Sequence, residues 1–136
     1  MATVYETLEK IDKLKQHKRK VDQLKEAGDF VVLTIMQGAY SKNINFKMPP
    51  GSPPFETNKG AEKNEVTKKA LWNMCQRVMN HKSPQWQREK IFTDFLKSIN
   101  PKDAELMVAM KDKDLTSIFP TLNKELAKEV FPNYVK

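Results

Sequence analysis

The sequence predicts an all-α fold: a single-domain orthogonal bundle of about six to seven short helices, with a proline-rich extended strap at residues 41–62. Three observations predict it. Apolar residues recur at helical spacing in nearly every segment outside the strap. Ser, Thr, Asp or Asn, which cap helix starts, precede most of these segments. The strap concentrates prolines that neither helix nor central strand accepts. At 136 residues, one domain covering residues 1–136 is expected.

The first part of the chain is expected to form three helices. The segment "TVYETLEKIDKLKQ" starts with Thr3 and has Glu6 three residues later, which is a capping box. The next, "HKRKVDQLKEAG", stops at Gly28, a residue type favoured just beyond a helix. Asp29 can cap "FVVLTIMQGAY", which is apolar nearly all round and is therefore expected to be buried. Its β-branched residues leave a strand as the alternative.

Residues 41–62 form a long connection. Prolines at positions 49, 50, 53 and 54 fix φ, remove backbone donors and hold each preceding residue extended. Phe46, Met48 and Phe55 are expected to pin this strap to the core. Two interpretations stay open: the strap covers the ends of neighbouring helices, or it presents side chains to a partner.

Helical patterns resume after the strap. "NEVTKKALWNMCQRVMN" has one apolar face, and "SPQWQREKIFTDFLKSI" follows with Ser83 as expected N-cap and Pro84 at the first helical position. Asn100 is likewise the expected N-cap of the next helix, "PKDAELMVAMK", which begins with a proline. A short turn around "LTSIF" leads to a last helix, capped by Asn123 or Thr121.

No residue pattern typical of catalysis stands out, so we expect a non-enzymatic protein with no catalytic residues, no metal and no cofactor. Two histidines and one cysteine show no zinc-site spacing, and four glycines form no phosphate loop. "DKD" at 112–114 lacks the glycine and glutamate of a calcium loop and is interpreted as solvated helix-end charge. Cys75 is interpreted as a buried inert thiol, and Trp72 as core or groove edge, with base stacking as the alternative.

The expected location is the cytoplasm. A single cysteine, Cys75, excludes an internal disulfide and favours a reducing compartment. No apolar run approaches the roughly 20 residues of a membrane helix, so no membrane partner is expected. The start "MATVYETLEKIDK" carries charges where a signal peptide needs an apolar core.

The net charge of +7 is unevenly distributed. Residues 1–90 hold 17 Lys and Arg against 10 Asp and Glu, whereas residues 91–136 hold 7 of each. The basic part is therefore the candidate surface for an acidic partner, with a merely solvated surface as the alternative. The first candidate binding group is Lys13, Lys15, Lys18, Arg19 and Lys20. The second is Lys68, Lys69 and Arg77, with Lys82, Arg88 and Lys90 nearby.

Four segments carry a resemblance to known proteins. They are "YETLEKIDKLKQHKRKVDQLKE", "MQGAYSKNINFKMPPGSPPF", "REKIFTDFLKSINPKDAELMVAMKDKDL" and "LNKELAKEVFPNYV". Together they resemble a family of small, mostly uncharacterised proteins of T4-like tailed bacteriophages. The chain is also similar to the phage accessory proteins that bind host RNA polymerase, although no quoted motif separates the two groups. The resemblance implies a virus-encoded accessory protein in the host bacterial cytoplasm and assigns a role to no single residue.

These observations lead to one expected function and two alternatives. The expected function is that of a non-enzymatic phage accessory protein that binds a host macromolecular machine, with RNA polymerase the first candidate. A nucleic-acid-binding protein that uses the same lysines is the first alternative. An inhibitor of a host defence protein is the second.

Overall fold

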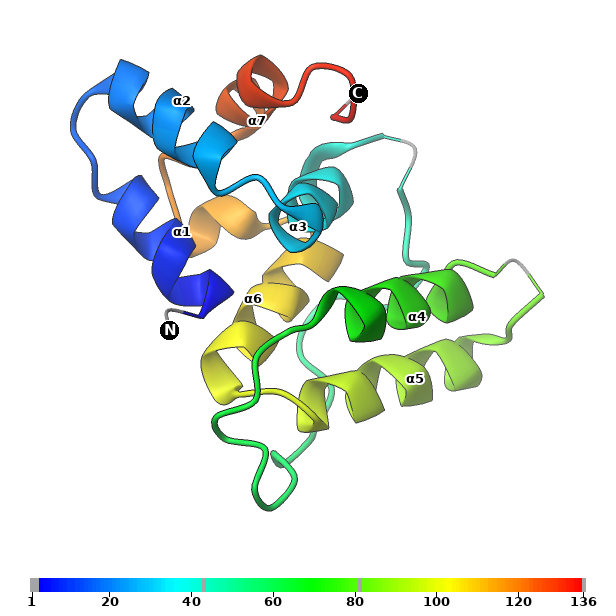
Figure 1. The fold of residues 1–136 in the computed structure, drawn as a ribbon. Coiled ribbons are helices and arrows are strands. Elements are labelled where there is room, and N and C mark those ends of the chain that lie inside the picture. The colour runs from blue at the N-terminus through cyan, green and yellow to red at the C-terminus, as the bar shows by residue number, and fades with distance from the viewer. Residues whose placement is uncertain (1–2, 43, 81, 136) are drawn as a thin grey trace.

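The computed structural model describes residues 3–42, 44–80 and 82–135. Within these ranges all regular structure is helical (Figure 1), which confirms the predicted all-α single-domain bundle. Residues 30–40 are a helix, so the strand alternative is wrong. The elements are α1 (Val4–Asp12), α2 (His17–Glu26), α3 (Phe30–Tyr40), α4 (Lys68–Val78), α5 (Gln85–Lys97), α6 (Pro101–Lys111), the 3-10 turn η1 (Leu115–Ser117) and α7 (Lys124–Val130).

Helix α6 lies at the centre of the bundle. It packs against α1, α3, α5 and η1, and its apolar side chains are buried on several sides. Helices α1, α2 and α7 form one group beside it, the antiparallel pair α4 and α5 forms another, and α3 lies between the two groups (Figure 1). The side of the bundle that carries α4 is therefore distinct from the side that carries α1 and α2.

None of the described helices combines the length and the apolar character that crossing a membrane requires.

Polar side chains cap four helix starts as the sequence predicts. Thr3, Asp29, Asn100 and Asn123 each accept a hydrogen bond from the backbone N–H three residues further on, at 2.9–3.2 Å. The last helix is thus capped by Asn123, while Thr121 hydrogen-bonds to Asp12 instead. Each cap satisfies a donor that the helix itself leaves unpaired.

Helix α5 begins one residue later than the sequence suggests. Pro84 has an extended backbone, with ψ 159°, and is the N-cap of α5. Ser83 does not cap the helix, because its hydroxyl donates to the carbonyl of Arg77. The first turn of α5 therefore has no side-chain cap.

Gly28 follows α2, as predicted, but its backbone does not adopt the left-handed conformation that usually favours glycine. Helix α2 ends at Glu26, its C-cap is Ala27, and Gly28 lies outside the left-handed region. A Cβ at Gly28 would lie 2.9 Å from Cε1 of Phe131. Glycine is needed because the aromatic ring packs directly against this stretch of backbone.

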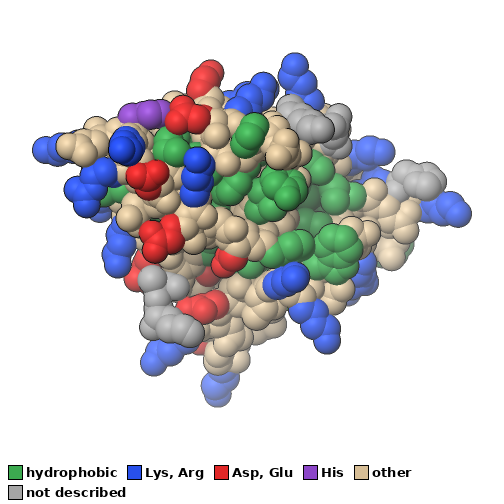
Figure 2. Space-filling view, turned by 45° about the horizontal axis from the view of Figure 1, so that its top comes forward, with side chains coloured by type: hydrophobic (Ala, Val, Ile, Leu, Met, Phe, Trp, Pro, Cys, Tyr) green, Lys and Arg blue, Asp and Glu red, His purple; other side chains and the backbone are tan. Residues whose placement is uncertain are grey.

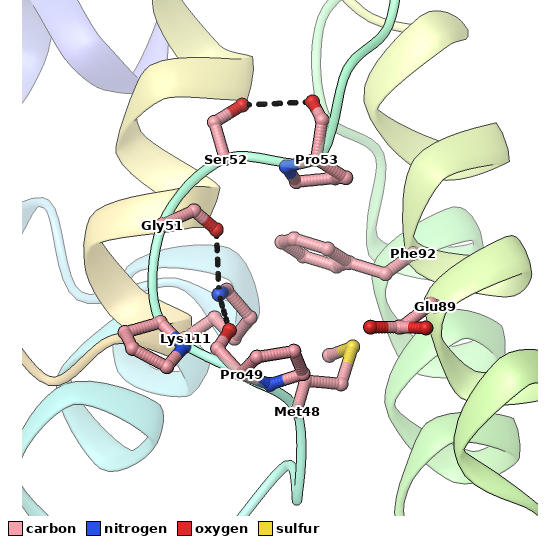
Figure 3. Close-up of a pocket in the computed structure, with 9 residues that line it drawn as sticks. Met48, Pro49, Gly51, Ser52, Pro53, Glu89, Phe92 and Lys111 are labelled. Carbon is pink, nitrogen blue, oxygen red and sulfur yellow. Dashed lines mark hydrogen bonds between the residues drawn. The ribbon is translucent and has the colours of Figure 1, made fainter.

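The strap runs across the bundle and is anchored by apolar and polar contacts. Phe46 is buried and Met48 and Phe55 are half-buried, so the predicted pins are confirmed. The ammonium of Lys111 on α6 donates to the carbonyl oxygens of Pro49, at 2.7 Å, and Gly51, at 2.9 Å (Figure 3). This contact fixes the strap against the central helix.

The segment 112–114 is only partly solvated: Lys113 and Asp114 are exposed as predicted, whereas Asp112 is half-buried and takes part in packing. Asp112 lies 2.6 Å from the Lys111 ammonium and accepts a hydrogen bond from the Gly51 N–H at 3.0 Å. Lys113 donates to the carbonyls of Gly38 and Ser41 at the C-terminal end of α3, at 3.1 and 3.0 Å. These charged side chains satisfy backbone groups of the strap and of α3.

Candidate functional site

An apolar groove of about 220 Å³ opens between α3 and α4. It is called the α3–α4 groove below. One wall is a single face of α3, because its residues recur at helical spacing: Phe30, Thr34, Gln37 and Gly38. The other wall is a single face of α4 with its C-cap: Trp72, Cys75, Gln76 and Met79. Two residues of the strap region, Ile44 and Phe46, complete the lining.

Two aromatic side chains stand at one end of the α3–α4 groove. The rings of Phe30 and Trp72 contact each other with centroids 5.9 Å apart and planes tilted by 60°. Trp72 keeps 51% of its surface exposed although it packs against Phe30. The ammonium of Lys68 lies 5.2 Å from the Phe30 ring centroid, a cation–π distance. With Lys69, these side chains line a wider, open hollow that continues the groove.

The floor of the groove is tightly packed and apolar. A Cβ at Gly38 would lie 2.8 Å from Cγ of Met110, so the backbone of α3 rests directly on α6. Cys75 is 5% exposed, and burial raises its pKa to about 11. A thiol with that pKa stays protonated at neutral pH, so Cys75 contributes an apolar surface. The predicted burial of Cys75 is confirmed, and its low reactivity stays a prediction.

The surroundings of the α3–α4 groove are positively charged. Of the described residues that line the groove and its open hollow, none is acidic. Asp29 neighbours Phe30, but its carboxylate caps α3. Figure 2 shows a cluster of hydrophobic side chains on one face, with Lys and Arg around its margin and most of the visible Asp and Glu gathered elsewhere. The groove and its open hollow therefore combine the exposed Trp72 with the two lysines Lys68 and Lys69.

The first predicted basic group lies at the junction of α1 and α2 and is mixed with acidic side chains. Lys13 is 3.9 Å from Glu9. Lys15 and Lys20 line a shallow hollow that also contains Glu125 and Glu129 of α7. Within the hollow, His17 Nε2 lies 2.9 Å from a Glu129 carboxylate oxygen. The two remaining members of the group, Lys18 and Arg19, are exposed.

The second predicted basic group is divided by the structure. Lys68 and Lys69 begin α4 and border the open hollow. Arg77 is exposed, but it lies roughly 140° around α4 from Trp72, so it faces away from the groove. The two predicted groups also lie on opposite sides of α3 (Figure 1) and do not form one patch.

Arg88, which the sequence places among the basic surface residues, is a structural side chain. It is 8% exposed. Its Nε donates to the carbonyl of Val78 at 2.9 Å, and its Nη2 donates to that of Asn80 at 3.0 Å. Arg88 thereby satisfies carbonyl groups at the C-terminal end of α4 and links α5 to it.

Several residues of the α3–α4 groove were not predicted as site residues. No sequence pattern marks Phe30, Gln37 or Ile44, and the sequence indicates Trp72 as a possible groove edge without indicating its partner Phe30. The pattern of each helix shows which residues share a face, but not that α3 and α4 meet across the strap. Among the described residues, no group of three or more His, Cys, Asp or Glu could hold a metal ion.

The described part of the chain is thus an all-α bundle with an apolar, lysine-edged groove. The chain belongs to a family of unknown function, DUF6433, whose family model matches residues 7–117. The matched interval contains every residue of the α3–α4 groove and ends before α7. No curated protein and no solved structure matches the chain.

Proposed function

We propose that this protein is a non-enzymatic accessory protein of a tailed bacteriophage that binds a host macromolecular machine through the α3–α4 groove. Host RNA polymerase is the first candidate. The viral setting and the choice of polymerase are supported by the sequence resemblance. The use of this groove is supported by one observation: the exposed Trp72 packed on Phe30 beside two lysines.

A binding role for this surface follows from the free-energy cost of leaving exposed apolar side chains in water. Contiguous exposed apolar patches are uncommon on soluble monomers and mark interaction sites. Trp is among the residues that contribute most when an interface forms around them. Trp72 is held by Phe30, so it loses little freedom on binding. Lys68 and Lys69 would mainly speed the encounter with an acidic surface.

The same features support a protein partner over a nucleic acid. Single-stranded nucleic acids stack bases on open aromatic faces along a positively charged channel. Here the rings of Phe30 and Trp72 are tilted by 60° against each other, so they form no parallel slot for a base. The larger basic group, at the α1–α2 junction, is interspersed with Glu9, Glu125 and Glu129.

The test is retention of purified host RNA polymerase by the immobilised protein. The unaltered chain and Trp86→Ala are expected to retain polymerase subunits at moderate salt, and Trp72→Ala is expected to lose them. Trp86 is the matched control, because it is 67% exposed on α5 and does not line the groove. Circular dichroism verifies that both variants are folded.

Two results would contradict this proposal. One is the absence of polymerase subunits from the unaltered protein, and the other is equal retention by Trp72→Ala. Nuclease treatment of the polymerase before the assay separates the alternative function. If retention disappears with the nucleic acid, the contact is to nucleic acid and not to protein.

A further inference from the structure

We infer that the α3–α4 groove receives an acidic amphipathic helix of the partner, with one large apolar side chain in the groove and carboxylates against Lys68 and Lys69. The inference rests on the proposed function, and it specifies the chemistry of the bound segment. Three properties of the groove carry it: its length, its volume and its charge.

The length of the groove matches a short helix. Its walls use α3 from Phe30 to Gly38 and α4 from Trp72 to its C-cap Met79. Helical stretches of this length span about 12–14 Å, or a little over two turns. An amphipathic helix that lies in a groove of this length presents anchors at positions i, i+3 or i+4, and i+7.

The volume of the groove suits one large apolar anchor. An apolar cavity of about 150 Å³ holds a benzene molecule, so a groove of about 220 Å³ accommodates an aromatic side chain or a leucine with a smaller neighbour. Phe46, Cys75 and Met79 supply apolar lining for such a side chain. Burial of such an apolar side chain away from water favours binding.

The charge of the groove selects an acidic segment. Lys68 and Lys69 border the open hollow at the Phe30 end. With no acidic side chain among the described lining residues, a basic helix would meet like charge at the Phe30 end.

A helix fits this site better than an extended peptide that pairs with a strand. β-Augmentation needs an exposed sheet edge to supply main-chain partners. The residues that the structure describes contain no strand. The groove walls are helix faces, so they offer side-chain contacts but no main-chain hydrogen-bond partners. The ligand must therefore pair its own backbone N–H and C=O groups, as a helix does.

Binding is measured by tryptophan fluorescence on the full chain carrying Trp86→Phe, in which Trp72 is the remaining tryptophan. The probe is a synthetic peptide of about 14 residues, the length of a typical helix, with Phe and Leu at i, i+3 and i+7 and Glu at most other positions. The comparison peptides are a scrambled version, a version with Lys in place of Glu, and a proline-rich peptide. Oligo(dT) is the nucleic-acid comparison.

The acidic amphipathic peptide is expected to bind at least about tenfold more tightly than every comparison ligand, and more weakly as salt rises. The double variant Lys68→Glu/Lys69→Glu is expected to weaken this peptide at least about tenfold and to strengthen the Lys version. The matched control, Lys18→Glu/Arg19→Glu, alters two exposed cations of the first basic group and is expected to change neither affinity. Circular dichroism checks the fold of each variant.

The inference is overturned if the scrambled, basic or proline-rich peptide binds as well as the acidic one, or if oligo(dT) binds more tightly. It also falls if no peptide binds while polymerase is retained in a Trp72-dependent manner, a result that leaves the proposed function intact. Conversely, selective binding of the acidic peptide without retention of polymerase supports this groove chemistry and removes polymerase as the partner.

Discussion

Lys111 and Gly51 join the central helix to the strap, with 2.9 Å between the ammonium nitrogen and the carbonyl oxygen. The same ammonium donates to Pro49 and contacts Asp112, so its three N–H groups have three oxygen partners. The Lys111 side chain is only 3% exposed. The path of the strap therefore depends on one buried charge as well as on the apolar contact of Phe46.

Lys111→Met is expected to destabilise the protein by about 3 kcal/mol, because it leaves the half-buried Asp112 carboxylate without its ion-pair partner and two carbonyls without their donor. Chemical denaturation measures the free energy of unfolding. Lys102→Met is the control: Lys102 is also on α6, but its side chain is 68% exposed, and its loss is expected to change stability by less than about 0.5 kcal/mol.

A second measurement tells whether the Lys111 substitution releases the strap. Trypsin is expected to cleave the variant faster after the exposed strap residues Lys47 and Lys59 than it cleaves the unaltered protein. Unchanged cleavage together with an unchanged unfolding midpoint would show that Lys111 does not anchor the strap.

Asp103→Ala is expected to reduce stability by about 2–3 kcal/mol. Asp103 is fully buried, and its carboxylate accepts from the backbone N–H of Tyr5 at 3.1 Å and from Asn100 Nδ2 at 2.8 Å. It thus joins the start of α1 to the start of α6. Asp103→Asn is expected to lose less stability than Asp103→Ala, since its single amide oxygen can still accept from one donor. Thermal unfolding of both, beside the exposed-site control Glu105→Ala, checks the order; equal losses from Asp103→Ala and Glu105→Ala would contradict it.

Tyr40→Phe is expected to cost about 1 kcal/mol, because the Tyr40 hydroxyl donates to the carbonyl of Leu122. Burial first, and then Asp114 and Glu125, raise the pKa of Tyr40 above its ordinary value of 10.0. The neutral phenol is favoured in the folded state, so this stabilisation is complete below pH 10 and declines as the pH rises further.

The expected signature of Tyr40 is a smaller loss of stability above pH 10 in the Phe variant than in the unaltered protein. Urea denaturation across that pH range measures it. Tyr134→Phe is the matched control, since Tyr134 is 52% exposed. Identical pH profiles for the Tyr40 variant and the unaltered protein would contradict the assignment.

The thiol of Cys75 is expected to react slowly with iodoacetamide while the protein is folded. Burial raises its pKa from 9.0 to about 11, which lowers the thiolate fraction at pH 8 about a hundredfold. The reaction rate of the folded protein is expected to rise with pH toward 11, whereas that of the urea-unfolded chain levels off above pH 9. A native rate at pH 8 within a few-fold of the unfolded rate would show that the thiol is accessible and ionised.

Local features of the sequence predicted the helices well. Thr3, Asp29, Asn100 and Asn123 mark helix starts because a short polar side chain there meets a specific unpaired N–H. The start of α5 was misplaced because Pro84 suits both the N-cap and the first helical position, and the choice depends on its ψ angle, which no sequence pattern shows.

The candidate site was only partly predictable, because it depends on which segments meet. Lys68 and Lys69 were identified as basic residues, and their position beside Phe30 follows from the packing of α3 on α4 across a long strap. Arg88 was counted as a surface cation because composition does not show that its side chain turns back to the carbonyls of Val78 and Asn80.

That buried guanidinium has a mechanical consequence. Arg88 of α5 holds the C-terminal end of α4, and the two helices pack along their lengths. The α4–α5 hairpin is therefore expected to move as one rigid unit. A movement of α4 at Trp72 would then be transmitted through α5 to Phe92, which together with Lys111 lines a small pocket under strap residues 48–53 (Figure 3). Binding of a partner at the α3–α4 groove is thus expected to shift the proline-rich strap on the other side of the α4–α5 hairpin.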